Sequence, residues 1–173
     1  MLEVSINQPK GKNLLMQEMQ KTFFNPVFMC IGTDKVFADS LGPRVGSLLN
    51  DRLTSPLFVY GLCNNNITAE NLTCSYNFIK AMHPSSQIVV IDSAVGTQGQ
   101  IGKVQICNGG IIPGAATNKK LPLVGDVSIV GIVADKGMAD FYTTCNEKLQ
   151  LVSNIANFIA DCILQYKQQP VQA

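Results

Sequence analysis

The chain has 173 residues, of which 46% are hydrophobic and only 14% are charged, and its formal net charge is +1. This length is typical of a single core, so we expect one domain over residues 1–173. The near-zero charge, without a cluster of lysine and arginine, argues against a nucleic-acid binder. So few charged residues leave much apolar surface on a monomer, and we therefore expect a homo-oligomer.

The sequence shows neither the pattern of a membrane span nor that of a signal peptide. No apolar run approaches the roughly 18 residues of a membrane span, and the N-terminus lacks the charged-then-apolar order of a signal peptide. We therefore expect a cytoplasmic protein that does not bind membranes. The six cysteines show no CxxC spacing, so the sequence indicates neither a zinc site nor redox chemistry of the thioredoxin kind.

Helices alternate with short strands along the chain. Apolar residues at helical spacing predict the helices, and short apolar runs, often β-branched, predict the strands. This alternation predicts an α/β fold, in which a mainly parallel sheet is covered by helices on both faces. We expect strand 27–31 near the centre of the sheet, because its unbroken apolar run is typical of a parallel strand covered on both faces. In chain order the predicted elements are helix 10–24, strand 27–31, helix 41–53, strand 57–60, helix 68–82, strand 87–91, strand 101–107, strand 127–133 and helix 145–167.

Two aspartates follow predicted strands. Asp39 lies between strand 27–31 and the next helix, and Asp92 comes directly after strand 87–91. Open α/β sheets place their ligands at the carboxyl ends of the strands, so both acids are candidates for one site. If the two strands are neighbours, we expect the carboxyl groups within about 6 Å of each other, sharing a proton. The alternative for Asp39 is structural, because aspartate is a preferred N-cap residue and a helix follows.

A loop of about twenty residues, 107–126, joins the last two predicted strands. Loops of this length in compact domains are usually functional or disordered, and its apolar residues favour an ordered binding loop. The pairs Gly109-Gly110 and Pro113-Gly114 let backbone amides approach a ligand closely. The sequence contains neither a Walker-type phosphate loop nor a GxGxxG motif, so phosphate binding is not indicated.

Histidine chemistry has little support. The single histidine, His83, closes helix 68–82, where the helix dipole favours it. A Ser-His-Asp or Cys-His site, or a metal site built on imidazole, would depend on this one residue. Carboxylates remain as the candidates, with one of them activating water and the other polarising a carbonyl group.

Three segments in this order resemble the germination protease of spore-forming bacteria, and still more its smaller sporulation relatives. They are IGTDKVFADSLGP at 31–43, VVIDSAVG at 89–96 and CNGGIIPGAATN at 107–118. The resemblance implies a phosphorylase/hydrolase-like three-layer α/β fold and an unusual aspartic-type peptidase with Asp39 and Asp92 as its acids. It also implies a cytoplasmic role in the sporulating cell or spore, with a protein or peptide substrate such as small spore proteins. The candidate substrate-binding residues are Gly32, Asp34, Asn108, Gly109, Gly110, Pro113, Gly114 and Asn118.

The chain also departs from that family. Asp34 stands where the germination protease pattern has asparagine, and it adds a third acid near the site. The chain is shorter than the germination protease, and we expect no pro-segment. Hydrogenase maturation endopeptidases share the general plan and hold nickel with carboxylates and a histidine, but the later half of this chain has no histidine, so we expect no metal or cofactor. A peptidase, another hydrolase and an inactive binding or regulatory module all stay open.

Overall fold

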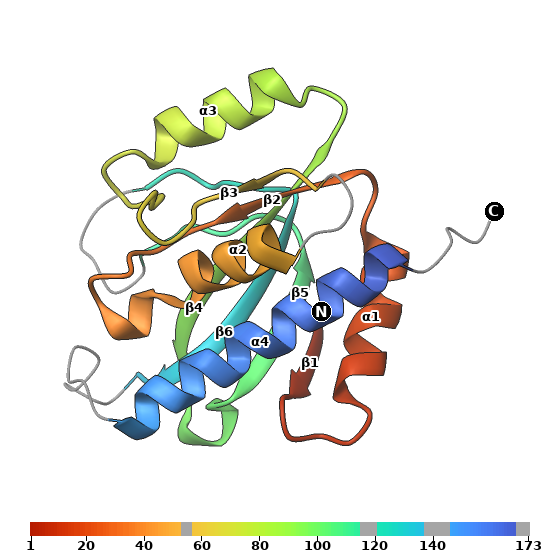
Figure 1. Cartoon of the computed structure of the whole chain (residues 1–173), viewed down its shortest axis with the longest axis vertical. Coiled ribbons are helices and arrows are strands. Elements are labelled where there is room, and N and C mark those ends of the chain that lie inside the picture. Colours follow the sequence, from red (N-terminus) through yellow and green to blue (C-terminus); the bar gives the residue numbers. More distant parts are fainter. Residues whose placement is uncertain (53–56, 115–120, 137–145, 169–173) are drawn as a thin grey trace.

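A six-stranded sheet forms the middle layer of the computed structural model, which describes residues 1–52, 57–114, 121–136 and 146–168 (Figure 1). The strands lie in the order β1-β5-β6-β4-β2-β3. The pairs β6–β4, β4–β2 and β2–β3 are parallel, whereas β5 is antiparallel to both β1 and β6. The strand bounds are β1 Leu2–Ser5, β2 Pro26–Cys30, β3 Val59–Tyr60, β4 Gln87–Gly96, β5 Lys103–Asn108 and β6 Val127–Asp135.

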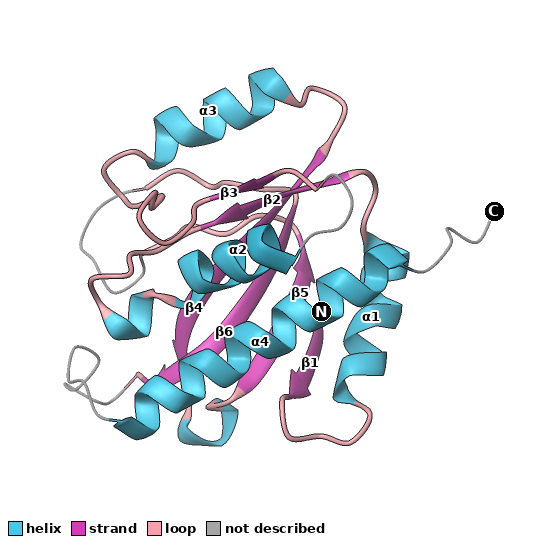
Figure 2. Cartoon of the chain, in the orientation of Figure 1, coloured by secondary structure: helices cyan, strands magenta, loops and turns pink. Residues whose placement is uncertain are grey.

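Helices cover both faces of this sheet, so the predicted three-layer α/β fold is confirmed. Figure 2 shows α1, α2 and α4 on one side of the strands and α3 on the other. The larger core lies under α1, α2 and α4, and the smaller core lies under α3 and the loop that follows β5. Of the described helices, none combines the length and the apolar character needed to cross a membrane. The helix bounds are α1 Gly11–Thr22, α2 Leu41–Arg52, α3 Leu72–Met82 and α4 Asn146–Gln168.

The prediction that strand 27–31 lies near the centre of the sheet is wrong, because β2 has only β3 between it and the edge. All five residues of β2 are nevertheless buried. Phe28 and Cys30 pack into the larger core, while Val27 and Met29 pack into the smaller one. The unbroken apolar run therefore reflects helices on both faces of β2, and it says nothing about how many strands flank it.

The predicted element order omits the first strand. The structure begins with β1, an edge strand antiparallel to β5, before the first helix. Only Val4 of its four residues is buried, and an edge strand with one buried side chain has no apolar run for a sequence pattern to detect. At the other edge, β3 comprises only two residues, Val59–Tyr60, where the prediction extends from 57 to 60.

Helix α2 approaches the strands with its backbone. Gly42 and Gly46, four residues apart, lie on one face of the helix. A Cβ at Gly42 would meet the carbonyl oxygen of Ile31, and one at Gly46 would meet that of Gly61. This contact holds the start of α2, and with it the segment that carries Asp39, against the end of β2.

We expect Gly42→Ala to lower the free energy of unfolding by about 1–3 kcal/mol, because the new methyl group meets backbone that cannot move aside. Urea unfolding followed by circular dichroism measures the change. Gly99→Ala is the matched control, because a Cβ at Gly99 has no neighbour within 4 Å, and we expect a change below about 0.5 kcal/mol. Equal effects of the two substitutions would contradict the close packing of α2.

Candidate active site

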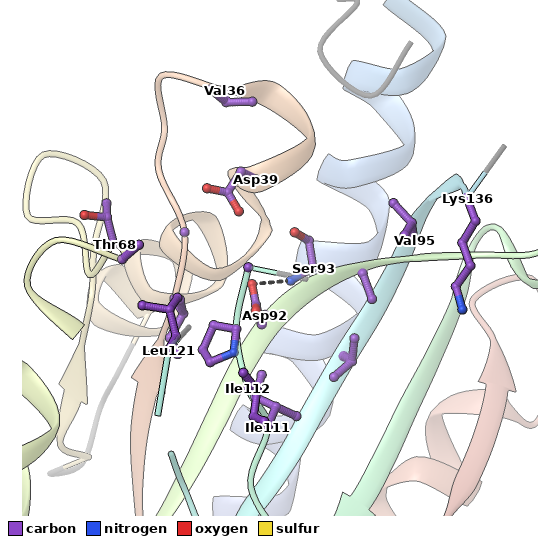
Figure 3. Close-up of a pocket in the computed structure, with 17 residues that line it drawn as sticks. Val36, Asp39, Thr68, Asp92, Ser93, Val95, Ile111, Ile112, Leu121 and Lys136 are labelled. Atoms are coloured by element: carbon purple, nitrogen blue, oxygen red, sulfur yellow. Dashed lines mark hydrogen bonds between the residues drawn. The ribbon is translucent and has the colours of Figure 1, made fainter. Parts of the chain in front are cut away.

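A cavity of about 480 Å³ opens where β2 ends, and both predicted acids line it (Figure 3). We call it the rim cavity. Asp39 comes from the segment between β2 and α2, and Asp92 comes from β4. The carboxyl groups of Asp39 and Asp92 face the same space in Figure 3. Gly32, Pro113 and Gly114, which were also predicted as site residues, line the same cavity.

A turn at Gly32 directs the chain away from the sheet and places Asp39. Gly32 has φ +133°, and a Cβ there would meet the carbonyl oxygen of Asp39, so this position requires glycine. The backbone N–H of Thr33 donates to the carbonyl oxygen of Asp39 at 3.0 Å. The loop is thus closed by backbone contacts, and Asp39 lies over the end of β2.

The alternative interpretation of Asp39 as the N-cap of α2 is not what the structure shows. Asp39 is the last residue of a short 3-10 helix, Phe37–Asp39. Ser40 directly precedes α2, and its carbonyl oxygen accepts the first helical bond from the N–H of Arg44 at 3.0 Å. The Asp39 side chain is therefore a wall of the rim cavity.

Asp92 lies within β4, whereas the prediction places it just after the strand. β4 continues to Gly96 because β6 remains beside it, but its pairing with β2 ends at the pair Cys30–Ile91. Asp92 is thus the first residue of β4 beyond the end of β2. Its side chain is 6% exposed, and its Oδ1 accepts a hydrogen bond from the N–H of Ser93 at 2.8 Å.

Burial makes both acids reluctant to ionise. It raises the pKa of Asp39 from 3.8 to about 6, an effect partly offset by the backbone N–H of Thr33. The pKa of Asp92 is raised well above 3.8, first by burial and then by the negative charge of Asp39. As the pH rises Asp39 therefore loses its proton first, and Asp92 keeps its proton beside the Asp39 carboxylate.

The third acid, Asp34, is exposed and does not line the cavity. Its carboxylate accepts the N–H of Asn64 at 3.0 Å, and its own N–H donates to Oδ1 of Asn66 at 3.3 Å. Asp34 therefore joins two loops outside the cavity, and its role in substrate binding stays a prediction.

Asn108 and Gly109 lie at the other end of the sheet, so their predicted place beside the acids is wrong, whereas Gly110 directly precedes Ile111, which lines the cavity. β5 runs antiparallel to β6, and Asn108 pairs with Val127 at the start of β6. The N–H of Gly109 then donates to the carbonyl oxygen of Asp126 at 2.8 Å. These residues lie where they do because β5 is antiparallel to β6, and the sequence resemblance did not predict the direction of β5. Asn118 lies outside the described residues.

The middle of the same loop does reach the acids. Ile111 pairs with Val124, and Ile111 and Leu121 pack against the core under α3. Ile111, Ile112 and Leu121 line the rim cavity, although none of them was predicted. The adjacent pair Ile111-Ile112 could have indicated that this part of the loop is a site, because two neighbouring apolar residues in a loop usually pack against another part of the protein.

Three further residues that line the cavity were missed because they belong to β4. Ser93, Ala94 and Val95 follow Asp92 in the strand. Lys136, which directly follows β6, also lines the cavity, but Figure 3 shows it beyond Val95, apart from the two carboxyl groups. His83 is not among the lining residues, and its Nε2 lies 2.8 Å from the hydroxyl oxygen of Tyr60. Within the described part of the chain, no three His, Cys, Asp or Glu side chains come together as a metal site.

The family described as "Protein of unknown function (DUF1256)" matches residues 4–162. The chain belongs to this family. This DUF1256 protein is 35% identical over 151 residues to the uncharacterized protein YyaC of Bacillus subtilis (strain 168), a match that covers 87% of the chain and 74% of YyaC.

A solved structure shares the fold of this DUF1256 protein. The [NiFe] hydrogenase maturation protease HycI from Thermococcus kodakarensis KOD1 matches it with a TM-score of 0.54 and 17% identity. The match covers 88% of this chain and 99% of HycI. The predicted relation to hydrogenase maturation endopeptidases is therefore confirmed for the fold.

The raised pKa values imply that ionised Asp39 and Asp92 destabilise the folded protein. The folded state holds these protons more tightly than the unfolded chain, so the free energy of unfolding falls as the pH rises above 3.8. For Asp39 this loss is complete above about pH 6, and for Asp92 it continues to higher pH.

We therefore expect Asp92→Asn to raise the melting temperature by about 3 °C or more at pH 8 and to change it little at pH 4. Asparagine keeps the acceptor for the Ser93 N–H and carries no charge. Thermal unfolding across this pH range measures the difference. Asp34→Asn, at an exposed acid outside the cavity, should show no such gain at pH 8, and a gain of equal size at both pH values for Asp92→Asn would argue against the burial of a charge.

Proposed function

We propose that this protein is a peptidase of the germination-protease type that activates water with Asp39 and Asp92. The observation that carries the proposal is that two acids with raised pKa values line one cavity and interact electrostatically. Aspartic-type hydrolysis needs such a pair, in which one carboxyl group is ionised while the other keeps its proton. The three segments that resemble the germination protease, and the fold shared with a maturation protease, support the same reaction class.

In the proposed reaction the Asp39 carboxylate takes a proton from water while the water oxygen attacks the carbonyl carbon of a peptide bond. Asp92 donates its proton to the carbonyl oxygen, so the tetrahedral intermediate is neutral. When the C–N bond breaks, Asp39 returns its proton to the leaving amine, and a hydroxyl group of the intermediate returns a proton to Asp92. The amides of Asn108 and Gly109 take no part, because they lie at the other end of the sheet.

The wider setting is also proposed from the resemblance. We infer that the substrate is a protein of the sporulating cell or spore, such as a small spore protein, and that the enzyme acts in the cytoplasm. Exposed aromatic side chains support the proposal of a homo-oligomer, because large apolar groups in water favour association. They include Phe24, which is 76% exposed, and Phe58 and Phe78, which are each 53% exposed.

The test of the reaction is cleavage of small spore proteins by the wild type, Asp39→Asn and Asp92→Asn. Loss of a general acid or base should lower kcat/KM by about 10²–10⁴-fold. Asp34→Asn is the matched control, because Asp34 is an acid of the same loop that does not line the cavity, and it should keep its activity. Cleavage should also persist with a chelator. Activity that survives either cavity substitution, or that the chelator abolishes, contradicts the mechanism.

The pH dependence gives an independent check. We expect kcat/KM to rise as the pH increases through about 6, where Asp39 ionises, and to fall at higher pH, where Asp92 loses its proton. A series of initial rates across this range measures both limbs. A rate that is highest below pH 4, where both acids are protonated, would rule out Asp39 as the base.

A folded wild type that binds these proteins but cuts none of them under any of these conditions would favour the second candidate, an inactive binding or regulatory module. The hydrogen bond from Ser93 to Asp92 is the observation behind this candidate. It shows that backbone already occupies one oxygen of the acid.

A further inference from the structure

The C-terminal part of β4, residues 92–96, has a neighbouring strand on only one side. β6 pairs with β4 from Asp92 to Gly96, but β2 ends opposite Ile91. The chain turns away from β4 at Gly32, whose N–H donates to the carbonyl oxygen of Ile67 at 2.8 Å. Along 92–96, β4 therefore has an edge where β2 would have continued, and in the described part of the chain no other strand takes that place.

The hydrogen bonds between β4 and its neighbouring strands show which backbone groups of β4 face this edge. In a parallel pair, the N–H and C=O of alternate residues face the same neighbour. The carbonyl oxygen of Ile91 accepts the N–H of Ile31, so Ser93 and Val95 also face the β2 side. Gly96 faces β6, and its carbonyl oxygen accordingly accepts the N–H of Lys136 at 2.8 Å.

Three of these edge groups have no partner among the described residues. The Ser93 N–H is used by Asp92. The Ser93 carbonyl oxygen and the N–H and carbonyl oxygen of Val95 form no hydrogen bond on this side. Both residues line the rim cavity, so these groups border the space beside the two acids.

The walls of the cavity decide what kind of side chain fits beside this edge. In Figure 3, Val36 lies on one side of the two carboxyl groups, and Ile111, Ile112 and Leu121 lie on the other. An acidic side chain would meet the negative charge of Asp39. A basic one would hold both aspartates ionised and remove the shared proton. Apolar side chains match these walls.

We propose that an extended apolar peptide segment binds in the rim cavity as an added strand on β4, in the place that β2 leaves free. Its backbone bonds to the Ser93 carbonyl oxygen and to the N–H and carbonyl oxygen of Val95, and its side chains contact Val36 and Ile112. Strand addition of this kind takes its affinity from backbone hydrogen bonds and its specificity from side-chain contacts. The inference rests on the proposed function, since it names how the substrate of that site is held with a peptide carbonyl level with Asp92.

The test uses Asp39→Asn, so that bound peptide is not cut. The probe is a pool of acetylated, amidated decapeptides of alanine, valine, leucine, serine and threonine, from which the best binder is selected. That peptide is then made with N-methyl groups at odd or at even positions. Only alternate amides of an added strand face β4, so one pattern should weaken binding at least about tenfold more than the other. Equal effects of both patterns, or no binder in the pool, would overturn the inference.

Hydrogen exchange locates the bound peptide. We expect exchange of the Val95 amide to slow at least about tenfold on binding, because its N–H gains a partner. The Asp92 amide faces β6 and should not change. Protection of neither residue, or of both equally, would contradict strand addition on this edge.

A pair of variants tests the apolar wall. Ile112 lines the cavity and is 60% exposed, whereas Leu123 belongs to the same loop, is 62% exposed and does not line it. Ile112→Asn should weaken peptide binding about tenfold, and Leu123→Asn should change it less than about twofold. Equal losses would place the peptide elsewhere.

These outcomes separate the inference from the proposed function. Pattern-dependent binding with no cleavage by the wild type supports strand addition and contradicts the peptidase. Cleavage that depends on both aspartates, with binding that is insensitive to the methylation pattern, supports the peptidase and overturns strand addition.

Discussion

β2 stops at Cys30 while its neighbour β4 continues to Gly96, and the turn that ends β2 is the constraint on which the site depends. Gly32 adopts a backbone conformation that other residues rarely reach, and the backbone of α2 at Gly42 packs against Ile31 just before it. If β2 continued beside β4, its residues would fill the space between Asp39 and Asp92. The cavity is therefore the consequence of one strand being shorter than the next.

The same space keeps two acids in an apolar setting. Each has a raised pKa, and the charge of Asp39 contributes to that of Asp92. Such an arrangement lowers stability wherever one of them ionises, and natural proteins tolerate this at functional sites. The large core formed by α1, α2 and α4 on the sheet borders the rim through Val95, and it supplies stability that offsets this cost.

The features of the fold that depend on local pattern were predictable. The apolar run of β2, the helical stripes and the two aspartates after apolar runs are visible in the sequence, and the structure brings both aspartates to one cavity. Features that depend on which strands lie side by side could not be predicted from the sequence. The length of β4 depends on β6, and the place of Asn108 depends on the direction of β5, which an alternating strand does not reveal. β1 has one buried residue and therefore no detectable pattern.

The loop between β5 and β6 is fastened far from the acids and reaches them only with its middle. Gly109 binds Asp126 at the start of β6, and Asp126 also accepts the N–H of Ile88 at the start of β4 through its carboxylate. Residues in the middle of the loop can therefore be exchanged during evolution without moving Asp39 or Asp92, which other segments hold. Under the proposed function, the loop residues that would contact the substrate and the acids that would activate water lie on separate segments, so a change in the substrate that is bound does not require a change of the acids.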